Sequence, residues 1–368
     1  MKTILHGAFG RHNFGDMLFP HIVHKLIKEN IDESEIEFCD VISRDMTEFG
    51  GHNIKSIADF IDYNEAVNVI HVGGEIGSCT LRTALSMCNP LSSINKIEAN
   101  KLNSLKLKLA YLLPKSLFKK SNKFITNSVS GRKRTAISLY KEYDFVGLRD
   151  KRSGRKARAS GVHCNIVPDS AVMTRHFFGD TISARSSASK IKNLNEKIGE
   201  DYIAVQLKQK YPDQRNSLSP AMESIISKTN LPILFFCAGV APGHDSLDLY
   251  KEKFKNLPTD KVHFFDGLNI WDICNVISNA KFVIGTSLHV RILSQQYCRP
   301  RVTFGAMTKH MEFIKKWDNI NNTNVTLNTL SNYIQKELKE HDYEADATQL
   351  KFLENEYLEK STWVNLLK

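Results

Sequence analysis

Residues 3–29 read TILHGAFGRHNFGDMLFPHIVHKLIKE, and this order of residue types indicates the fold class. The apolar run from Thr3 to Ala8 has the length and composition of a buried β-strand. A turn with three glycines follows, and apolar residues then recur at helical spacing from Asp16 to Glu29. A strand, a turn and a helix in this order form the repeating unit of a parallel sheet with crossover helices. We therefore predict an α/β fold.

The same order of elements recurs along the chain. We expect further strands at 35–41, 67–72, 124–129, 144–148, 164–167, 202–207, 232–237, 262–265, 281–284 and 302–304, with helices such as 135–143, 221–227, 246–255, 270–279 and 290–297 between them. The serine-rich segment 181–199 has no clear period and is interpreted as a linker. We predict two Rossmann-like domains, residues 1–180 and 200–329, with a cleft between them. Residues 330–368 are expected to form a helical tail that packs back across one or both domains.

Length and composition exclude several classes of protein. At roughly 150 residues per domain, 368 residues suit two domains. A hydrophobic content of 42% with 24% charged residues is typical of a globular protein rather than a disordered or fibrous one. No run reaches the ~20 apolar residues of a membrane span, and the first residues lack a signal-peptide core. The seven cysteines are scattered without a C-x-x-C pair, so we expect reduced thiols in the cytoplasm and no metal site.

Positive charge is concentrated in one segment. Residues 99–158 contain seventeen basic and three acidic side chains, a net charge of +14, whereas the whole chain carries +10. This segment favours an anionic partner such as a phosphorylated substrate or a lipid headgroup, although a solvated basic face would look the same. Within it, residues 101–123 interleave leucine with lysine, which predicts a surface helix on an anionic membrane. The alternative is that these leucines face the core and the lysines face water.

Candidate binding residues follow the predicted strands, because ligands of open α/β sheets bind beyond the carboxyl ends of the strands. Glycines let a ligand approach the backbone, and a helix N-terminus favours phosphate or carboxylate. The first turn lacks the spacing of a dinucleotide fingerprint or a P-loop, and a plain tight turn is the alternative. The candidates are Gly7, Gly10, Asn13, Gly15 and Asp16 after the first strand, Gly73, Gly74 and Glu75 after the third, and Asp169, Ser287 and Lys309 after later ones.

Two strand ends carry the side chains with the clearest chemistry. Arg149 ends the strand 144–148, where its guanidinium could bind a carboxylate or phosphate through two hydrogen bonds. A structural ion pair with Asp150 or Asp169 is the alternative. His289 lies where the strand 281–284 turns into a helix, and an imidazole there can exchange a proton near neutral pH. Arg291, two residues further along that helix, is expected to point elsewhere.

Taken in order, these motifs resemble the polysaccharide pyruvyl transferase family. The set comprises G-x-x-G-x-x-N-x-G-D at 7–16, Gly73-Gly74, Leu148-Arg149-Asp150, Pro168-Asp169, Ser287-Leu288-His289 and Lys309, and the resemblance spans about residues 4–313. It implies a GT-B-like fold, phosphoenolpyruvate as co-substrate without a further cofactor, and a lipid-linked or nucleotide-linked saccharide acceptor that becomes a pyruvate ketal. It also implies that Arg149 binds the phosphoenolpyruvate anion, that His289 is catalytic and that Lys309 reaches a phosphorylated part of the acceptor.

Two departures from the family pattern bear on the donor. Ser287 stands where many members carry an arginine, and Glu75 stands where a third glycine is frequent. Our hypothesis gives His289 the acid/base role and Arg149 the anion, with Asp16 or Glu75 accepting a proton from the acceptor. It places the turns of Arg149 and His289 on facing sides of the cleft, around a small anion.

Two other functions remain open on the sequence. A GT-B glycosyltransferase that uses a nucleotide sugar would have the same two domains. A non-catalytic member of the family could hold anionic glycan or lipid on the basic segment. No nucleic-acid motif is present, and a homo-oligomer is compatible with the sequence.

Overall fold

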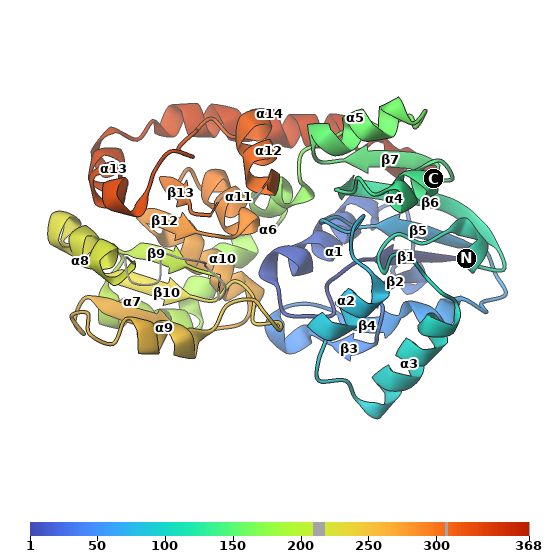
Figure 1. Ribbon diagram of the computed structural model, residues 1–368, viewed down its shortest axis with the longest axis horizontal. Coiled ribbons are helices and arrows are strands. Elements are labelled where there is room, and N and C mark those ends of the chain that lie inside the picture. Colours follow the sequence, from blue (N-terminus) through green and yellow to red (C-terminus); the bar gives the residue numbers. More distant parts are fainter. Residues whose placement is uncertain (209–217, 306–307, 368) are drawn as a thin grey trace. The chain divides into compact units, whose positions relative to one another are not determined.

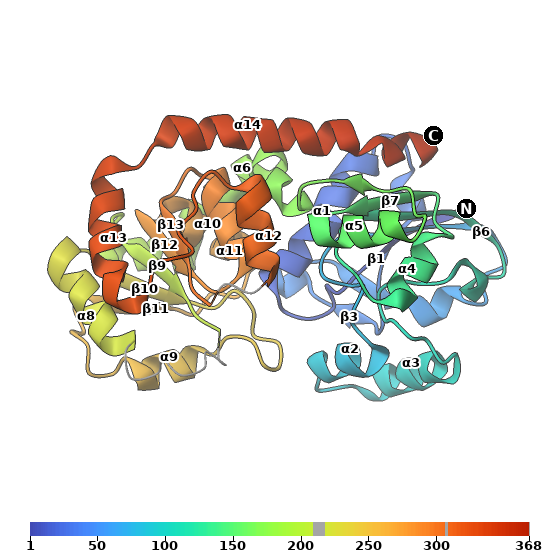
Figure 2. The same ribbon diagram turned by 45° about the horizontal axis from the view of Figure 1, so that its top comes forward.

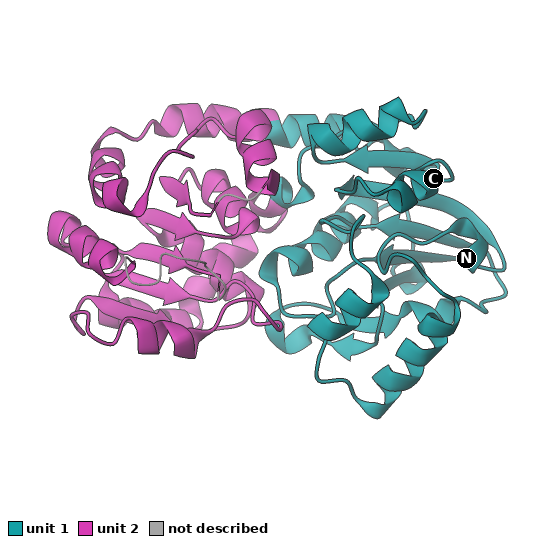
Figure 3. Ribbon diagram, viewed as in Figure 1, with its two compact units in different colours: residues 1–173, 353–368 teal, residues 174–352 magenta. Residues whose placement is uncertain are grey.

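The computed structural model describes residues 1–208, 218–305 and 308–367. The chain forms two compact units (Figure 3), one of Met1–Met173 with Leu353–Lys368 and one of Thr174–Phe352. Each unit is a Rossmann-like α/β unit built around one sheet (Figure 1). The predicted fold class is confirmed at the level of each unit.

Unit 1 is built on an eight-stranded sheet with the order β3-β4-β2-β1-β5-β6-β7-β8, in which only the β3–β4 pair is antiparallel. Its strands are β1 (Lys2–His6), β2 (Ile36–Asp40), β3 (Arg44–Asp45), β4 (Asn53–Ser56), β5 (Val67–His71), β6 (Ser121–Val129), β7 (Phe145–Leu148) and β8 (Asn165–Ile166). Its α-helices are α1 (Phe14–Ile27), α2 (Leu81–Met87), α3 (Ser93–Ser104), α4 (Arg134–Tyr140) and α5 (Lys151–Ala159). All five residues of β5 are buried, which explains why the sequence shows an apolar run there.

Unit 2 is built on a five-stranded parallel sheet with the order β11-β10-β9-β12-β13. Its strands are β9 (Ile203–Gln206), β10 (Ile233–Phe236), β11 (Val262–Phe265), β12 (Phe282–Gly285) and β13 (Arg301–Thr303). Its helices include α8 (Leu218–Thr229), α9 (Leu247–Lys253), α10 (Ile270–Asn279), α11 (Leu288–Gln296), α12 (Thr308–Trp317) and α13 (Leu327–Glu340). The strand order reverses between β9 and β12, as it does between β1 and β5 in unit 1. Ligands of this fold bind at such switch points, beside the carboxyl ends of the two strands.

The expected linker at 181–199 is helical. Residues 174–198 form α6 (Thr174–Ala184), a 3-10 turn (Arg185–Ser187) and α7 (Ser189–Ile198), and the division between the units falls at residue 173. Ile191 and Leu194 are buried, and Arg185 pairs with Asp272 of α10 at 2.5 Å. Few apolar residues of this segment contact the core, so its sequence, rich in serine and lysine, shows no clear helical period.

The C-terminal tail is helical, as expected, and its residues divide between the two units. Helix α14 (Tyr343–Lys360), labelled in Figure 2, begins in unit 2, and its residues from Leu353 onward belong to unit 1 (Figure 3). Tyr357 is buried in unit 1, where its hydroxyl donates a hydrogen bond to Asn127 Oδ1 of β6 at 3.0 Å.

The predicted membrane helix at 101–123 is wrong. Helix α3 ends at Ser104, and the next regular elements are a 3-10 turn (Lys115–Leu117) and β6. Leu109, Leu112 and Leu113 are buried in the core of unit 1, so the alternative holds for these leucines. Their positions at i, i+3 and i+4 would also fit a helix face, but Pro114 lacks a backbone N–H and interrupts a continuous helix over 101–123. In the described part of the chain, no helix is long and apolar enough to cross a membrane.

Candidate active site

The turn after β1 is held in place by a buried carboxylate. Asp40, at the end of β2, accepts a hydrogen bond from the backbone N–H of Gly10 at 2.7 Å. A Cβ atom at position 10 would lie 3.0 Å from the same carboxylate oxygen, which explains the glycine. Burial raises the pKa of Asp40 to about 6. Gly10 thus shapes the turn, and Gly7 and Gly15 on either side of it are buried.

Asp16 lies in the first turn of α1 and forms an ion pair. Its Oδ2 accepts a hydrogen bond from Arg11 Nη2 at 3.1 Å, and Arg11 Nη1 donates to the hydroxyl of Tyr111 at 3.3 Å. Asn13 is the N-cap residue of α1, although its side chain makes no capping hydrogen bond. The sequence analysis did not single out Arg11. The available signal was a cation inside a glycine-rich turn that also contains a carboxylate.

The second glycine turn lies beside the first. Gly73 and Gly74 have φ angles of +152° and +93°, and a Cβ at Gly73 would meet the ring of Phe19 of α1 at 2.9 Å. A Cβ at Gly74 would lie 3.7 Å from Asp16 Oδ1, so the two turns meet at the switch point between β1 and β5. Glu75, the next residue, is exposed.

Arg149 forms the structural ion pair that was the alternative to anion binding. Its Nη1 donates to Asp169 Oδ2 at 2.6 Å, and both side chains are buried. The adjacency of β7 and β8 brings these residues together, because Leu148 and Ile166 are register partners. Asp150 serves a different purpose, as its Oδ1 caps α5 through the N–H of Ser153 at 2.7 Å.

In unit 2, Gln206 at the end of β9 holds the turn that leads into α11. Its Oε1 accepts hydrogen bonds from the backbone N–H groups of Thr286 and Ser287, each at 3.0 Å. Its Nε2 donates to both carboxylate oxygens of Asp245 at 2.9 Å. Burial raises the pKa of Asp245 to about 7. The sequence analysis missed Gln206, because nothing local distinguishes a polar residue at the end of a buried strand.

Ser287, His289 and Lys309, the candidate residues of unit 2, lie at the starts of helices α11 and α12. Ser287 is the N-cap residue of α11, and His289, the second residue of that helix, is 8% exposed. Lys309 is the second residue of α12 and is half-buried. Arg291, which was expected only to point away from the His289 site, is buried in unit 2, where its Nε donates to Asp318 Oδ2 at 2.6 Å.

A sequence profile of the family described as polysaccharide pyruvyl transferase matches residues 13–305. The chain belongs to this family. The matched range covers most of both units, including Arg149 and His289. The protein is therefore a transferase, and no curated protein sequence matches it significantly.

Solved structures resemble the transferase in fold. UDP-N-acetylglucosamine 2-epimerase from Rickettsia bellii shares 10% identity with a TM-score of 0.58, covering 99% of this chain and 97% of that one. S. aureus MnaA, solved with UDP, gives 9% identity and a TM-score of 0.59 over 100% and 98% of the two chains. The Methanocaldococcus jannaschii UDP-GlcNAc 2-epimerase shares 12% identity with a TM-score of 0.56, covering 96% of this chain and 99% of that one. These likenesses place the transferase in the GT-B-like fold class.

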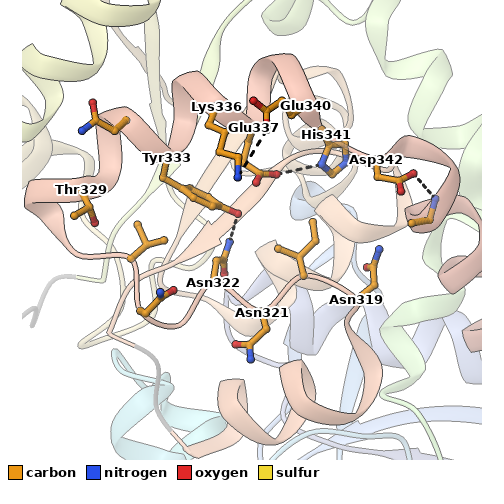
Figure 4. A pocket seen from close by; sticks show the side chains of 15 residues that line it. Asn319, Asn321, Asn322, Thr329, Tyr333, Lys336, Glu337, Glu340, His341 and Asp342 are labelled. Carbon is orange, nitrogen blue, oxygen red and sulfur yellow. Dashed lines mark hydrogen bonds and ion pairs between the residues drawn. The ribbon is translucent and has the colours of Figure 1, made fainter.

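Unit 2 of the transferase also has a pocket of about 790 Å³, lined mostly by polar residues, between the loop 319–325, α13 and the start of α14 (Figure 4). Tyr333 and Asn322 are joined across it by a hydrogen bond of 2.9 Å, and His341 lies 3.5 Å from Glu337. None of the candidate residues lines this pocket. Within the described ranges, no group of His, Cys, Asp and Glu side chains is arranged to hold a metal ion.

Proposed function

We propose that the transferase moves a pyruvyl group from phosphoenolpyruvate to a saccharide acceptor. The observation that carries this proposal is the family match over residues 13–305, which includes the strand ends bearing Arg149 and His289. The ion pair of Arg149 with Asp169 and the burial of His289 support fixed positions for the two side chains.

The reaction consists of two additions at one carbon. One acceptor hydroxyl adds to C2 of phosphoenolpyruvate while C3 takes up a proton and becomes a methyl group. A second hydroxyl then forms a bond to C2, and the C2–O bond to phosphate breaks. The products are a cyclic pyruvate ketal and inorganic phosphate. The two hydroxyl protons balance the methyl proton and the proton left with phosphate or solvent.

In unit 1 we assign the donor anion to Arg149. A guanidinium has five N–H donors, and the contact with Asp169 uses Nη1. Asp169 is therefore a positioning residue that fixes the plane in which Arg149 presents its donors. Glu75 and Asp16 are the two candidates for accepting a proton from an acceptor hydroxyl. Glu75 is exposed, whereas Asp16 Oδ2 already accepts a hydrogen bond from Arg11.

In unit 2 we assign proton delivery to C3 to His289. The first turn of a helix has backbone N–H groups without intrahelical partners and a positive dipole end, which suits a site for an anionic substrate. Gln206 is the positioning residue, because its hydrogen bonds to the N–H groups of Thr286 and Ser287 fix the start of α11. Lys309 is assigned to a phosphorylated part of a lipid-linked or nucleotide-linked acceptor.

We place the reaction in the cytoplasm. All seven cysteines lie in the described residues and are unpaired thiols, which supports a reducing compartment.

Calorimetry and product analysis test the proposal. Titrating the full chain with phosphoenolpyruvate should give saturable heat, and inorganic phosphate should compete with it. Incubation with phosphoenolpyruvate and a panel of nitrophenyl hexosides and UDP-hexoses should release phosphate only with the correct acceptor. That acceptor should gain the mass of one pyruvyl group. Release of nucleotide without phosphoenolpyruvate would establish a glycosyltransferase instead, and binding without turnover on any acceptor would favour a non-catalytic member.

A histidine variant tests the assignment of the proton. His289→Ala should lower kcat by about 10²- to 10⁴-fold, the usual contribution of a positioned general acid. His263→Ala is the matched control, because His263 is a half-buried histidine on β11 whose Nε2 lies 3.2 Å from the backbone oxygen of Asp260, outside the candidate site. Turnover of the His289 variant at the rate of the control would remove His289 from the mechanism.

A further inference from the structure

Helix α3 of unit 1 exposes two isoleucines while it buries two polar side chains. Ile94 and Ile97 are 64% and 70% exposed, although isoleucine is among the residue types most often buried. On the same helix, Asn95 and Glu98 are buried together with Ala99 and Leu102. An ordinary amphipathic helix places these residue types the other way round.

Hydrogen bonds to the loop after β2 fix this orientation. Asn95 Nδ2 donates to the backbone oxygen of Ser43 at 2.8 Å, and Glu98 Oε2 accepts from the backbone N–H of Ser43 at 3.0 Å. Rotating α3 to bury the isoleucines would leave these groups without their partners, at the cost of losing charge-assisted hydrogen bonds. The exposed isoleucines are therefore a stable feature of unit 1.

Lysines surround the exposed isoleucines. Lys96 and Lys101 lie on α3, and Lys106 and Lys108 follow its end beside Leu105, which is 39% exposed. Lys101 pairs with Asp62 at 3.0 Å, whereas the other three lysines form no ion pair with any described residue. We call Ile94, Lys96, Ile97, Lys101, Leu105, Lys106 and Lys108 the α3 surface. In both views α3 lies at the outside of unit 1, away from its sheet (Figures 1 and 2).

We propose that the α3 surface docks unit 1 on an anionic lipid bilayer. The two isoleucines would enter the boundary between headgroups and acyl chains, and the lysines would contact lipid phosphates. Two apolar side chains on a helix of twelve residues, with Leu105 just after it, cover far less than the ~800 Å² per partner that a stable protein interface buries. Lysines without carboxylate partners match an anionic surface in charge. A bilayer fits both properties, since it needs only shallow insertion supported by charge.

This surface differs from the membrane helix expected at 101–123. Leu109, Leu112 and Leu113 of that stretch are in the core, and the apolar contact comes mainly from Ile94 and Ile97 before it, with Leu105 beside them. The proposal does not depend on the donor chemistry, so the two can fail separately. If both hold, docking brings the transferase to the surface where a lipid-linked saccharide is embedded.

Flotation of the full chain with vesicles tests the docking. We use phosphatidylcholine vesicles with and without phosphatidylglycerol, at low and high salt. Binding should require the anionic lipid and should weaken in high salt, because screening removes the lysine contribution. Ile94→Ser/Ile97→Ser should lower the partition coefficient at least about tenfold, since it removes both inserting side chains. Lys96→Gln/Lys106→Gln/Lys108→Gln should lower it by roughly fivefold per lysine.

Matched variants on unit 2 control for general effects. Leu249→Ser removes a side chain that is 46% exposed on α9, and Lys192→Gln/Lys197→Gln/Lys339→Gln removes three exposed charges. Neither should change the partition coefficient. Serine and isoleucine have similar helix propensities, so circular dichroism of the isoleucine variant should match wild type.

Three outcomes would overturn the proposal. The first is no flotation with anionic vesicles, and the second is flotation that the isoleucine variant retains. The third is a concentration-dependent dimer, seen by light scattering, that Ile94→Ser/Ile97→Ser dissociates, because the surface would then join two copies of the chain.

Discussion

Replacing Gln206 with leucine should weaken unit 2 in a pH-dependent way. Leucine keeps the approximate size of the side chain but removes every hydrogen bond that the amide of Gln206 makes. Asp245 loses the Nε2 donor at 2.9 Å and keeps the backbone N–H of Ala238 at 2.8 Å. The N–H of Ser287 loses its acceptor, whereas the N–H of Thr286 keeps the backbone oxygen of residue 206 at 3.1 Å.

The magnitude follows from these losses. A hydrogen bond to a charged group contributes about 1.5–3 kcal/mol, and a neutral one contributes about 1 kcal/mol. When Asp245 is ionised, the lost contacts therefore sum to about 3 kcal/mol, with the contribution of the half-exposed Ser287 at the low end. When Asp245 is protonated, both lost contacts are neutral, and the sum falls to about 1.5–2 kcal/mol. Because burial raises the pKa of Asp245 to about 7, the change between the two values falls between pH 5 and pH 8.

Urea unfolding at pH 5 and pH 8 measures both values. Gln206→Leu should lose more free energy of unfolding at pH 8 than at pH 5. Gln335→Leu, which removes one exposed contact to a backbone oxygen at 3.3 Å, should change the free energy of unfolding by less than about 0.5 kcal/mol at either pH. A loss for Gln206→Leu that is below about 1 kcal/mol, or equal at the two pH values, would refute the reasoning.

Three further predictions concern unit 1. Arg149→Met leaves the buried Asp169 carboxylate unpaired and should cost about 3–5 kcal/mol in urea unfolding. Arg149→Met/Asp169→Leu should recover much of that stability without restoring phosphoenolpyruvate binding by calorimetry, and full binding by the double variant would contradict the anion role. Gly73→Ala introduces a Cβ at φ +152° and 2.9 Å from the Phe19 ring, and should cost about 2 kcal/mol or more. Gly179→Ala, with its nearest side-chain atom at 3.9 Å, should be neutral or slightly stabilising in the same unfolding assay. Burial lowers the pKa of His52 to about 2 and that of His21 to about 4, so both stay neutral in the folded protein while the unfolded chain binds protons below about pH 6.5. The free energy of unfolding should therefore fall as pH falls from 7 to 5, by up to about 1.4 kcal/mol per pH unit for each histidine. His52 stacks on Phe38, so His52→Phe keeps an aromatic ring there and should show a shallower fall. An unchanged slope in that variant would count against the account.

The fold was predictable because its signal is local. A strand of a parallel sheet is buried on both faces, so its residues appear as one apolar run, as in β5 and β10. The strand β3 was missed because it spans only two residues. The strand β4 was missed because its four residues alternate between exposed and buried, which leaves no apolar run. The helix α7 was missed because its serine- and lysine-rich sequence places only Ile191 and Leu194 in the core.

The candidate site was predictable only in part. Strand ends are visible in the sequence, and so the glycine turns, Arg149 and His289 could be found there. Asp169 was one of two carboxylates named as an ion-pair partner for Arg149, but the other long-range partners could not be found. Gln206 and Asp245 are 39 residues apart, and Arg11 and Tyr111 are 100 apart. No local pattern connects such pairs.

The amino-acid sequence alone established an α/β chain of two sheets, the order of its strand-end motifs and its resemblance to a transferase family. Tertiary structure decided which carboxylate faces Arg149, which amide holds the start of α11, and which apolar residues near the basic segment reach solvent. The physical reason is that periodicity reports only whether a face is buried. The direction and partner of a polar side chain depend on which strands become neighbours in the sheet.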